Sequence, residues 1–300
     1  MKFAIIGEGV IDRFLSNDSY VDVIGGSGLN TAIATRFAGL DADWVTLISK
    51  DLPGRSIADY ASEQGVFPRN TPQISNPTPL VEISLNADGS PNYSFQLDNA
   101  CDWQWTLESL QVLNTYDVVH LTSLSGVLQP GADALYEFLS CREPSLLFTY
   151  DPNARPSALK PHEENFAKSR IEELVRLANI VKVSEEDLHW ISPVSAKESA
   201  ARWSTLGPTF VVLTRGEEGV SLFTDGQLIA EIAGVHTQVI DTVGAGDTIM
   251  AWILHTIEKE GTLPSPTALV SGLNLAVKAA AITCSRQGCK PPKASEVLES

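Results

Sequence analysis

The segment best suited to chemistry is a glycine turn, VIDTVGAGD, which ends at Asp247 and precedes a helical apolar pattern that stops at Gly261. Backbone amides at the N-terminus of a helix lack partners within the helix and stabilise phosphate there. The turn offers four such amides, those of Gly244, Ala245, Gly246 and Asp247. Because no Lys-Ser or Lys-Thr pair follows the last glycine, the turn is not a Walker A loop. Asp247 could be an ordinary helix cap, but a cap alone does not account for the two glycines.

Two earlier glycine clusters are less specific than this turn. The first, from Gly7 to Asp12, lacks the third glycine of a dinucleotide fingerprint, so we reject an NAD site there. Asp12 follows a strand, where α/β sheets bind ligands, and could either accept hydrogen bonds from two sugar hydroxyls or be a solvated turn residue. The second cluster, GGSGLN, opens a helix and allows close approach of a ligand, although an ordinary glycine turn is the alternative. Its candidate ligand-binding residues are Gly25, Gly26 and Asn30.

The two clusters that precede helices together resemble a known family. DTVGAGD is similar to the C-terminal signature of the PfkB, or ribokinase-like, carbohydrate kinases, and GGSGLN resembles their N-terminal signature. The resemblance extends from Ile5 to Gly288. It implies an α/β fold, a ribokinase-like three-layer αβα sandwich with a mostly parallel sheet and a small β lid. It also implies that Asp247 is the base and that the amides of Gly244–Gly246 form an anion hole. By the same resemblance, Asp12, Gly26 and Asn30 hold the sugar.

Two further segments extend the resemblance toward the substrate and a metal. DPNAR resembles a fructokinase segment that lies near substrate and phosphates, and its candidates are Asp151, Asn153 and Arg155. Arg155 is the cation that we place at the phosphates, unless it is a surface residue after a turn. Ser184 and Asp187 stand where the family carries an Asn-x-x-Glu element acting on Mg²⁺. This chain departs from that pattern, and either Glu186 or Asp187 could serve.

The nucleotide and a monovalent cation complete what the resemblance implies. TRGEEG resembles the loop on the nucleotide side, with Thr214, Gly216 and Gly219 as candidates, and the helix carrying Asn274 is expected beside adenine. The family often holds K⁺ near the loops that here contain Asp241 and Gly288. The implied cofactors are therefore ATP, Mg²⁺ and, as a further expectation, K⁺.

Short β-type runs alternate with longer helical ones, which predicts a mostly parallel sheet covered on both faces. Strands are expected at 2–6, 44–49, 117–122, 146–150, 179–183 and 210–214, and helices at 28–40, 53–64, 131–140, 163–178 and 196–205. We expect one domain over residues 1–300. Two polar-alternating segments, about 13–24 and 80–97, predict lid strands, the second with an Asp88-Gly89 hairpin turn. An edge extension of the main sheet is the alternative.

Composition limits the partners. The 300 residues carry a formal net charge of −16, which argues against nucleic acid or an anionic membrane as a partner. A phosphate ligand must then be held by a local device. The four cysteines have no zinc spacing, the N-terminus has no signal-peptide core, and no apolar run reaches the length of a membrane span. We therefore expect a cytoplasmic protein with reduced thiols.

These observations predict an ATP-dependent sugar kinase, with fructose as the first substrate to test. A 2-keto-3-deoxygluconate kinase or a ribokinase is the alternative, and a nucleoside kinase or a non-catalytic sugar-sensing protein is less favoured. An anionic sugar would require an additional Arg or Lys in the sugar pocket. A homodimer formed through the lid is a further expectation.

Overall fold

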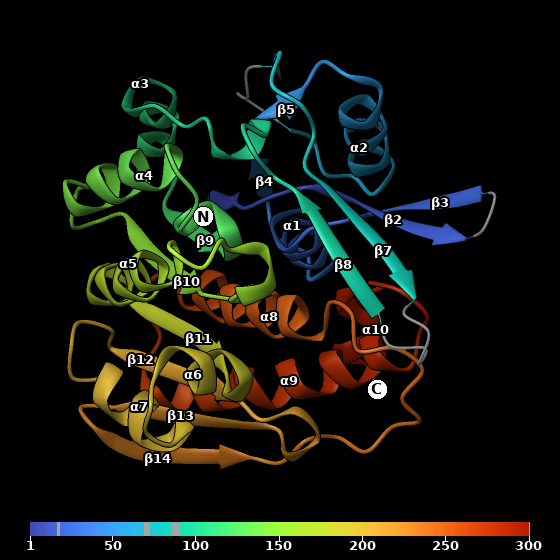
Figure 1. The fold of residues 1–300 in the computed structure, drawn as a ribbon. Helices are drawn as coiled ribbons and strands as arrows, with labels where there is room; N and C mark the ends of the chain where they lie inside the picture. The colour runs from blue at the N-terminus through green and yellow to red at the C-terminus, as the bar shows by residue number, and fades with distance from the viewer. Residues whose placement is uncertain (17–18, 69–72, 86–90, 300) are drawn as a thin grey trace.

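Eight strands form the central sheet of the molecule (Figure 1). The structure is a computed structural model, and it describes residues 1–16, 19–68, 73–85 and 91–299. In sheet order the strands are β14 (Gln227–Ile232), β13 (Val220–Thr224), β12 (Phe210–Thr214), β11 (Ile180–Ser184), β10 (Leu147–Asp151), β9 (Val118–Thr122), β1 (Phe3–Ile6) and β4 (Ala42–Val45). The pairs from β12 to β4 are parallel. The prediction of a mostly parallel sheet is confirmed.

Two cores lie on opposite faces of this sheet. Because side chains alternate along a strand, Phe3 and Ile5 join one core while Ala4 and Ile6 join the other. The helices of the first face are α1 (Ser27–Phe37), α2 (Leu52–Glu63), α8 (Ala245–Glu260), α9 (Pro266–Cys284) and α10 (Ala294–Leu298). Those of the second are α3 (Leu107–Leu110), α4 (Gly131–Ser140), α5 (Glu164–Leu177), α6 (Glu185–Ile191) and α7 (Ala196–Trp203). The fold is the expected three-layer sandwich.

At one edge of the sheet, β13 and β14 form an antiparallel hairpin that was not expected from the sequence. Asp225 and Gly226, between the two strands, have φ values of 49° and 77°. Positive φ at both central residues is the geometry of the hairpin turns that match strand twist, and Asp-Gly is a favoured pair for it. The expected strand 44–49 is also divided, into β4 and the short β5 (Ile48–Ser49), which pairs with β6 (Gln73–Ile74).

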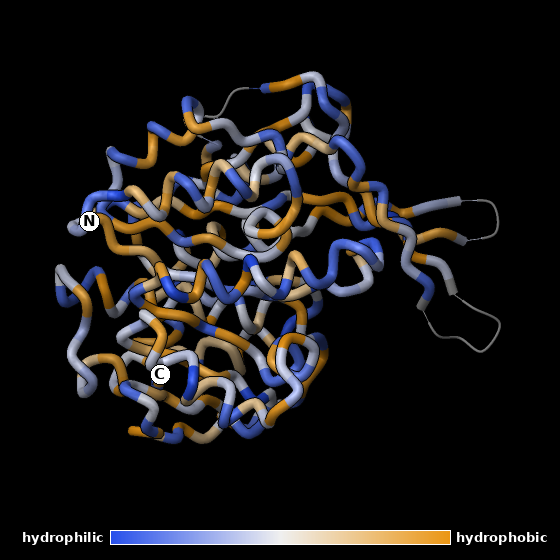
Figure 2. The backbone as a smooth tube through the Cα atoms, turned by 60° about the vertical axis from the view of Figure 1, so that its left-hand side comes forward, coloured by the Kyte–Doolittle hydropathy of each residue, from blue (hydrophilic) through white to orange (hydrophobic). Residues whose placement is uncertain are grey.

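A separate four-stranded sheet projects from the body, and we call it the flap sheet (Figures 1 and 2). Its order is β3 (Ser19–Gly25), β2 (Val10–Ser16), β7 (Leu80–Leu85) and β8 (Pro91–Gln96). These strands fall in the two segments expected to form a lid, and they form their own sheet rather than an extension of the main one. The expected turn at Asp88-Gly89 lies outside the described residues.

One helix in the described ranges is long and apolar enough to cross a membrane by length and composition alone. This is α9, with a mean hydropathy of 1.4, and half of the qualifying window is buried. Leu269, Leu273 and Ala276 of α9 lie in the first core with residues of α8. The apolar composition of α9 therefore has a structural explanation, since the helix forms part of that core.

Candidate active site

Asp247 lies in the first turn of α8 and is only 7% exposed. Two hydroxyls of α1 hold the same carboxylate oxygen: Ser27 Oγ donates to Asp247 Oδ1 at 2.7 Å, and Thr31 Oγ1 donates to it at 3.0 Å. Both hydrogen bonds fix the carboxylate through Oδ1, so Oδ2 can accept from a ligand. These contacts could not be predicted from a local motif, because they join residues 220 and 216 positions apart.

The glycine turn before Asp247 requires its first glycine. Gly244 is the N-cap of α8 with φ 80°, a left-handed conformation that side chains disfavour. A Cβ added there would lie 2.2 Å from Cys289 Sγ. The Ala245 amide donates to the Thr242 carbonyl oxygen at 3.2 Å. The amides of Gly244 and Gly246 precede the helical hydrogen-bond pattern and make no such bond within the described residues, so they are available to an anion.

The two loops expected to hold K⁺ contact each other next to this turn. Asp241 Oδ2 accepts from the backbone amide of Gly288 at 2.9 Å, and its Oδ1 accepts from Val243 N at 3.0 Å. The two loops named for K⁺ are thus in contact, with Asp241 as the link between them.

The candidate sugar residues gather where β2 and α1 begin. Gly26 has φ 107°, and a Cβ there would lie 2.4 Å from the Glu8 carbonyl oxygen, so the chain requires glycine at this position. The Cβ position of Gly25 is 3.0 Å from Asp12 Oδ2, and Asn30 is buried in the first turn of α1. Burial raises the pKa of Asp12 to about 6, while the positive charge of Arg155 acts to lower it.

The DPNAR segment reaches the same region through Arg155. Its side chain is exposed, and Nη1 donates to the carbonyl oxygens of Asn153 and Ala154 at 3.3 and 3.0 Å. The Arg155 charge also acts on the buried carboxyl of Glu8, whose pKa is raised by burial. Arg155 thus faces the carboxylates at the start of β2 and at the end of β1.

Asp151 itself is completely buried, and Lys182 Nζ donates to its Oδ2 at 2.7 Å. In this conformation Asp151 is enclosed and paired with Lys182, and its contact with a sugar stays a prediction. Burial raises the pKa of Asp151 to about 6, and Lys182 acts to lower it. Lys182 is not among the residues predicted from the sequence, although a lysine inside the apolar run of β11 was the available signal.

The predicted metal residues form a capping box at the start of α6. Ser184 Oγ accepts from the Asp187 amide at 3.0 Å, and Asp187 Oδ2 accepts from the Ser184 amide at 3.1 Å. Asp187 Oδ1 accepts from Ala154 N at 2.7 Å, which ties the DPNAR segment to α6. Asp187 is buried and Glu186 is exposed, so of the two alternatives only Asp187 lies against the candidate site.

The candidate nucleotide residues lie at the end of β12 and on α9. Thr214 is in register with Ser184 on the neighbouring strand. Gly216 and Gly219 both have positive φ, and a Cβ at Gly219 would lie 2.1 Å from the Ile232 carbonyl oxygen. Close packing therefore accounts for Gly219 without a ligand. Asn274 is exposed on α9, and its amide donates to the Val270 carbonyl at 2.8 Å.

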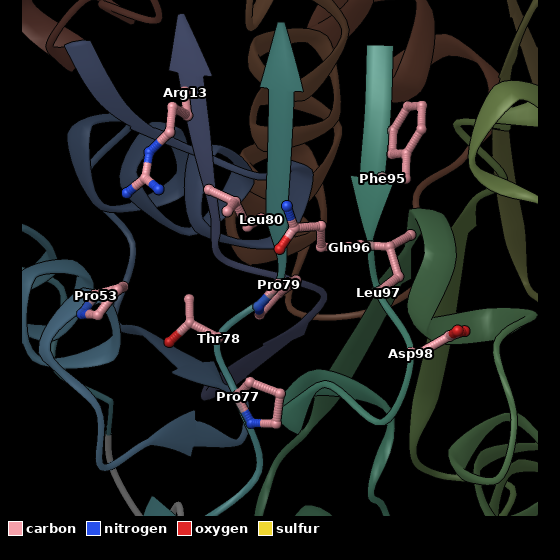
Figure 3. Close-up of a pocket in the computed structure, with 10 residues that line it drawn as sticks. All are labelled: Arg13, Pro53, Pro77, Thr78, Pro79, Leu80, Phe95, Gln96, Leu97 and Asp98. Carbon is pink, nitrogen blue, oxygen red and sulfur yellow. The ribbon is translucent and has the colours of Figure 1, made fainter. Parts of the chain in front are cut away.

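A pocket of about 480 Å³ lies against the flap sheet (Figure 3). Arg13 lines it, and because Arg13 follows Asp12 in β2, its side chain is on the opposite face of that strand. The other lining residues are Pro53, Pro77, Thr78, Pro79, Leu80, Phe95, Gln96, Leu97 and Asp98. The pocket contains none of the candidate site residues, so we assign the chemistry to the strand ends and helix N-termini instead.

The arrangement defines a class of enzyme. Ligands of parallel α/β sheets bind at the carboxyl ends of the strands, and this edge combines a fixed carboxylate with a helix N-terminus suited to phosphate. These are the parts that phosphoryl transfer to a hydroxyl requires.

Comparison with known proteins agrees with that class. The model of the pfkB family carbohydrate kinases matches residues 12–296. The chain belongs to this family and is an ATP-dependent sugar kinase. A fructokinase of Rhizobium leguminosarum bv. trifolii is 28% identical over 264 residues, covering 86% of this chain and 80% of the relative. Fructokinase-1 of Zea mays is 29% identical over 290 residues, covering 94% and 89%.

Solved structures share the fold. A fructokinase with bound ATP from Xylella fastidiosa superposes with a TM-score of 0.88 at 23% identity, covering 99% of this chain and 97% of that one. An aminoimidazole riboside kinase from Salmonella enterica gives 0.83 at 19% identity, covering 100% and 99%. The predicted ribokinase-like fold and family are confirmed.

Proposed function

We propose that this protein transfers the γ-phosphate of ATP to a hydroxyl of fructose, with Asp247 as the base. The observation that carries the proposal is the double anchoring of Asp247 Oδ1 by Ser27 and Thr31 at the N-terminus of a phosphate-binding turn. Fructose is favoured because the similar curated proteins named above are fructokinases.

Each group has a distinct role in this reaction. Asp247 accepts the proton of the attacking hydroxyl on the oxygen that the two hydroxyls leave available. The amides of Gly244, Ala245 and Gly246 stabilise the charge of the phosphoryl group in transfer. Asp12 and Asn30 bind sugar hydroxyls, and Gly25 and Gly26 let the sugar approach the backbone. Arg155 and Asn153 form the edge of the site on the side of the DPNAR segment.

The metal and nucleotide sites follow the same edge of the sheet. Asp187 and Ser184 offer oxygen donors of the kind that Mg²⁺ prefers, and the bound ion would neutralise phosphate charge. Thr214 and Gly216 lie on the nucleotide side, with Asn274 toward the adenine. Asp241 and the Gly288 segment suit K⁺, because a carboxylate and adjacent loop carbonyls suit a hard cation.

The charge around the sugar favours a neutral substrate. Arg155 is a cation next to the proposed sugar site, and an anionic 2-keto sugar could pair its carboxylate with it. However, Arg155 already faces the carboxylates of both Glu8 and Asp12. Its charge is therefore already opposed, and a sugar carboxylate would add repulsion. This observation ranks fructose or ribose above 2-keto-3-deoxygluconate.

We also propose a homodimer through the flap sheet. Phe14 is in register with Val21 on one side and with Ile83 on the other, so these residues share the face that carries Asp12. Phe14, Val21, Val23 and Tyr93 are exposed on this sheet. An exposed apolar face of this kind fits a second copy of the chain. We place the enzyme in the cytoplasm, where ATP is available.

The decisive experiment measures ATP consumption against a panel of sugars with the wild-type protein and Asp247→Asn. The amide oxygen of Asn can still accept from Ser27 and Thr31, but the side chain cannot take a proton. We expect turnover to fall by roughly 10²–10⁴-fold while the melting temperature changes little. The matched control is Asp51→Asn at the N-cap of α2, where the carboxylate accepts from the amides of Gly54 and Thr78 and from the Thr78 hydroxyl. Turnover by Asp247→Asn within threefold of wild type would show that the base lies elsewhere.

A further inference from the structure

Lys182 lies directly beneath the phosphate-binding turn, although nothing in the local sequence assigns it a role there. It is 4% exposed, in the middle of β11. A Cβ built on Gly246 would lie 2.8 Å from Lys182 Nζ and 3.7 Å from its Cε. The ammonium group therefore packs against the Cα of Gly246, in the first turn of α8.

This is an unfavourable place for a lysine that serves packing alone. The N-terminus of a helix carries partial positive charge and favours anions, so a cation there is repelled. Burial of the ammonium adds a desolvation cost. Its neighbours in β11, Val181 and Val183, are completely buried, and an apolar side chain would extend that pattern. Packing alone therefore does not explain a lysine at position 182, and its positive charge must have a role there.

Carboxylates surround this cation. Although burial alone lowers the pKa of Lys182, the carboxylates of Asp151, Asp187 and Asp247 raise it above its ordinary value. Asp151 holds the ammonium at 2.7 Å, while its other oxygen, Oδ1, is buried without a partner in the described structure. A carboxylate placed in this way fixes the ammonium at the end of its reach, against the turn.

We propose that Lys182, held by Asp151, is a positioning residue for phosphoryl transfer, and the proposal rests on the function assigned above to Asp247 and its turn. Its buried charge offsets that of the Asp247 carboxylate, so that a γ-phosphate can bind beside this base in a protein of net charge −16. Its ammonium also supports Gly246 from the Cα side and so sets the direction of the turn amides.

The test uses a double variant, Lys182→Met with Asp151→Asn, because the single change Lys182→Met would leave an uncompensated buried carboxylate. The double variant keeps side-chain length and local net charge, and it removes the Lys182–Asp151 ion pair and with it the cation beside the turn. The control is Arg170→Met, which removes another buried cation, paired with Asp133 and Glu173 between α4 and α5. Each protein is titrated with a non-hydrolysable ATP analogue and with ADP, and kcat and KM for the sugar are measured.

We expect the double variant to bind the ATP analogue at least tenfold more weakly and ADP within twofold of wild type. We expect kcat to fall by roughly 10²-fold, the scale seen when one preorganised electrostatic contact is lost, with KM for the sugar within threefold. Arg170→Met should change the melting temperature but neither affinity. Unchanged affinity for the analogue, or equal losses for both nucleotides, would overturn the role of Lys182. Because the titrations need no turnover, they remain decisive even if the wild type phosphorylates none of the sugars, an outcome that would refute the proposed function instead.

Discussion

Asp12 provides a sharp test of the sugar site, because the structure predicts that Asp12→Asn stabilises the protein while it impairs the enzyme. Burial raises the pKa of Asp12 from its ordinary 3.8 to about 6. At about 1.4 kcal/mol for each pKa unit, the full cost of keeping this carboxylate ionised is about 3 kcal/mol at neutral pH. Because the side chain is only partly enclosed, we expect the neutral Asn to recover about 1–2 kcal/mol, or roughly 2–6 °C in Tm for a chain of this size.

The sign of the pH dependence follows from linkage. Between about pH 4 and pH 6 the folded state binds more protons at Asp12 than the unfolded state, so stability falls as pH rises through this window. The advantage of Asp12→Asn should therefore be largest above pH 6 and shrink as pH falls toward 4. Melting curves of both proteins from pH 4.5 to 7.5 measure it, and KM for the sugar should rise at least tenfold in the variant.

Asp22, on the strand next to Asp12, provides a control whose pKa shift has the opposite sign. Asp22 on β3 pairs with Arg13 through two hydrogen bonds, which hold the pKa of its carboxyl below the ordinary value. Asp22→Asn should leave stability unchanged or slightly lower it, and should not alter sugar use. The reasoning about Asp12 is refuted if Asp12→Asn is less stable than wild type at pH 7.5, or if its advantage is the same at every pH.

Two further predictions concern the turn and the flap sheet. Gly244→Ala should lower Tm and turnover, because φ 80° costs about 1–2 kcal/mol for alanine and its Cβ would meet Cys289 Sγ. Adding Cys289→Ala should restore only the part of the Tm loss that comes from the clash with Cys289 Sγ. If the Tm losses of the two single variants simply add in the double variant, residues 244 and 289 are not in contact. For the dimer, Val21→Lys should convert a wild-type dimer into a monomer in analytical ultracentrifugation. Leu228→Lys, on the exposed edge strand β14, should not, and equal sedimentation of wild type and Val21→Lys would exclude this interface.

The sequence predicts the body of this fold well because each central strand is buried on both faces. Runs such as 210–213 are continuously apolar, and the helices 131–140 and 163–178 lie within one residue of α4 and α5. The β13–β14 hairpin escaped prediction although its Asp225-Gly226 turn was a recognisable signal. Its outer strand β14 is mostly exposed and carries Gln227 and Glu231, so the apolar run that marks a central strand is missing.

The parts of the candidate site also differ in how well they can be predicted from the sequence. The turn before Asp247 and the glycines before α1 are local features, because backbone conformation restricts the residue type at each position. The partners of Asp247 are not local, since Ser27 reaches it only because α1 and α8 pack side by side on one face of the sheet. Likewise, Lys182 meets Asp151 because β10 and β11 are parallel neighbours, with Tyr150 in register with Val181. Such contacts depend on strand order, which a single sequence does not specify.

The strand order also resolves the conflict between the acidity of the chain and its polyanionic substrate. With 37 acidic against 21 basic residues, surface cations cannot attract ATP over the whole molecule. Instead, the sheet brings β10 and β11 together at the N-terminus of α8, where amide dipoles and one buried ammonium act at short range. Groups enclosed in this way are screened little by salt, whereas an exposed basic patch would lose most of its effect at physiological ionic strength. A small number of buried, oriented groups can therefore outweigh an unfavourable net charge that acts mainly through solvent.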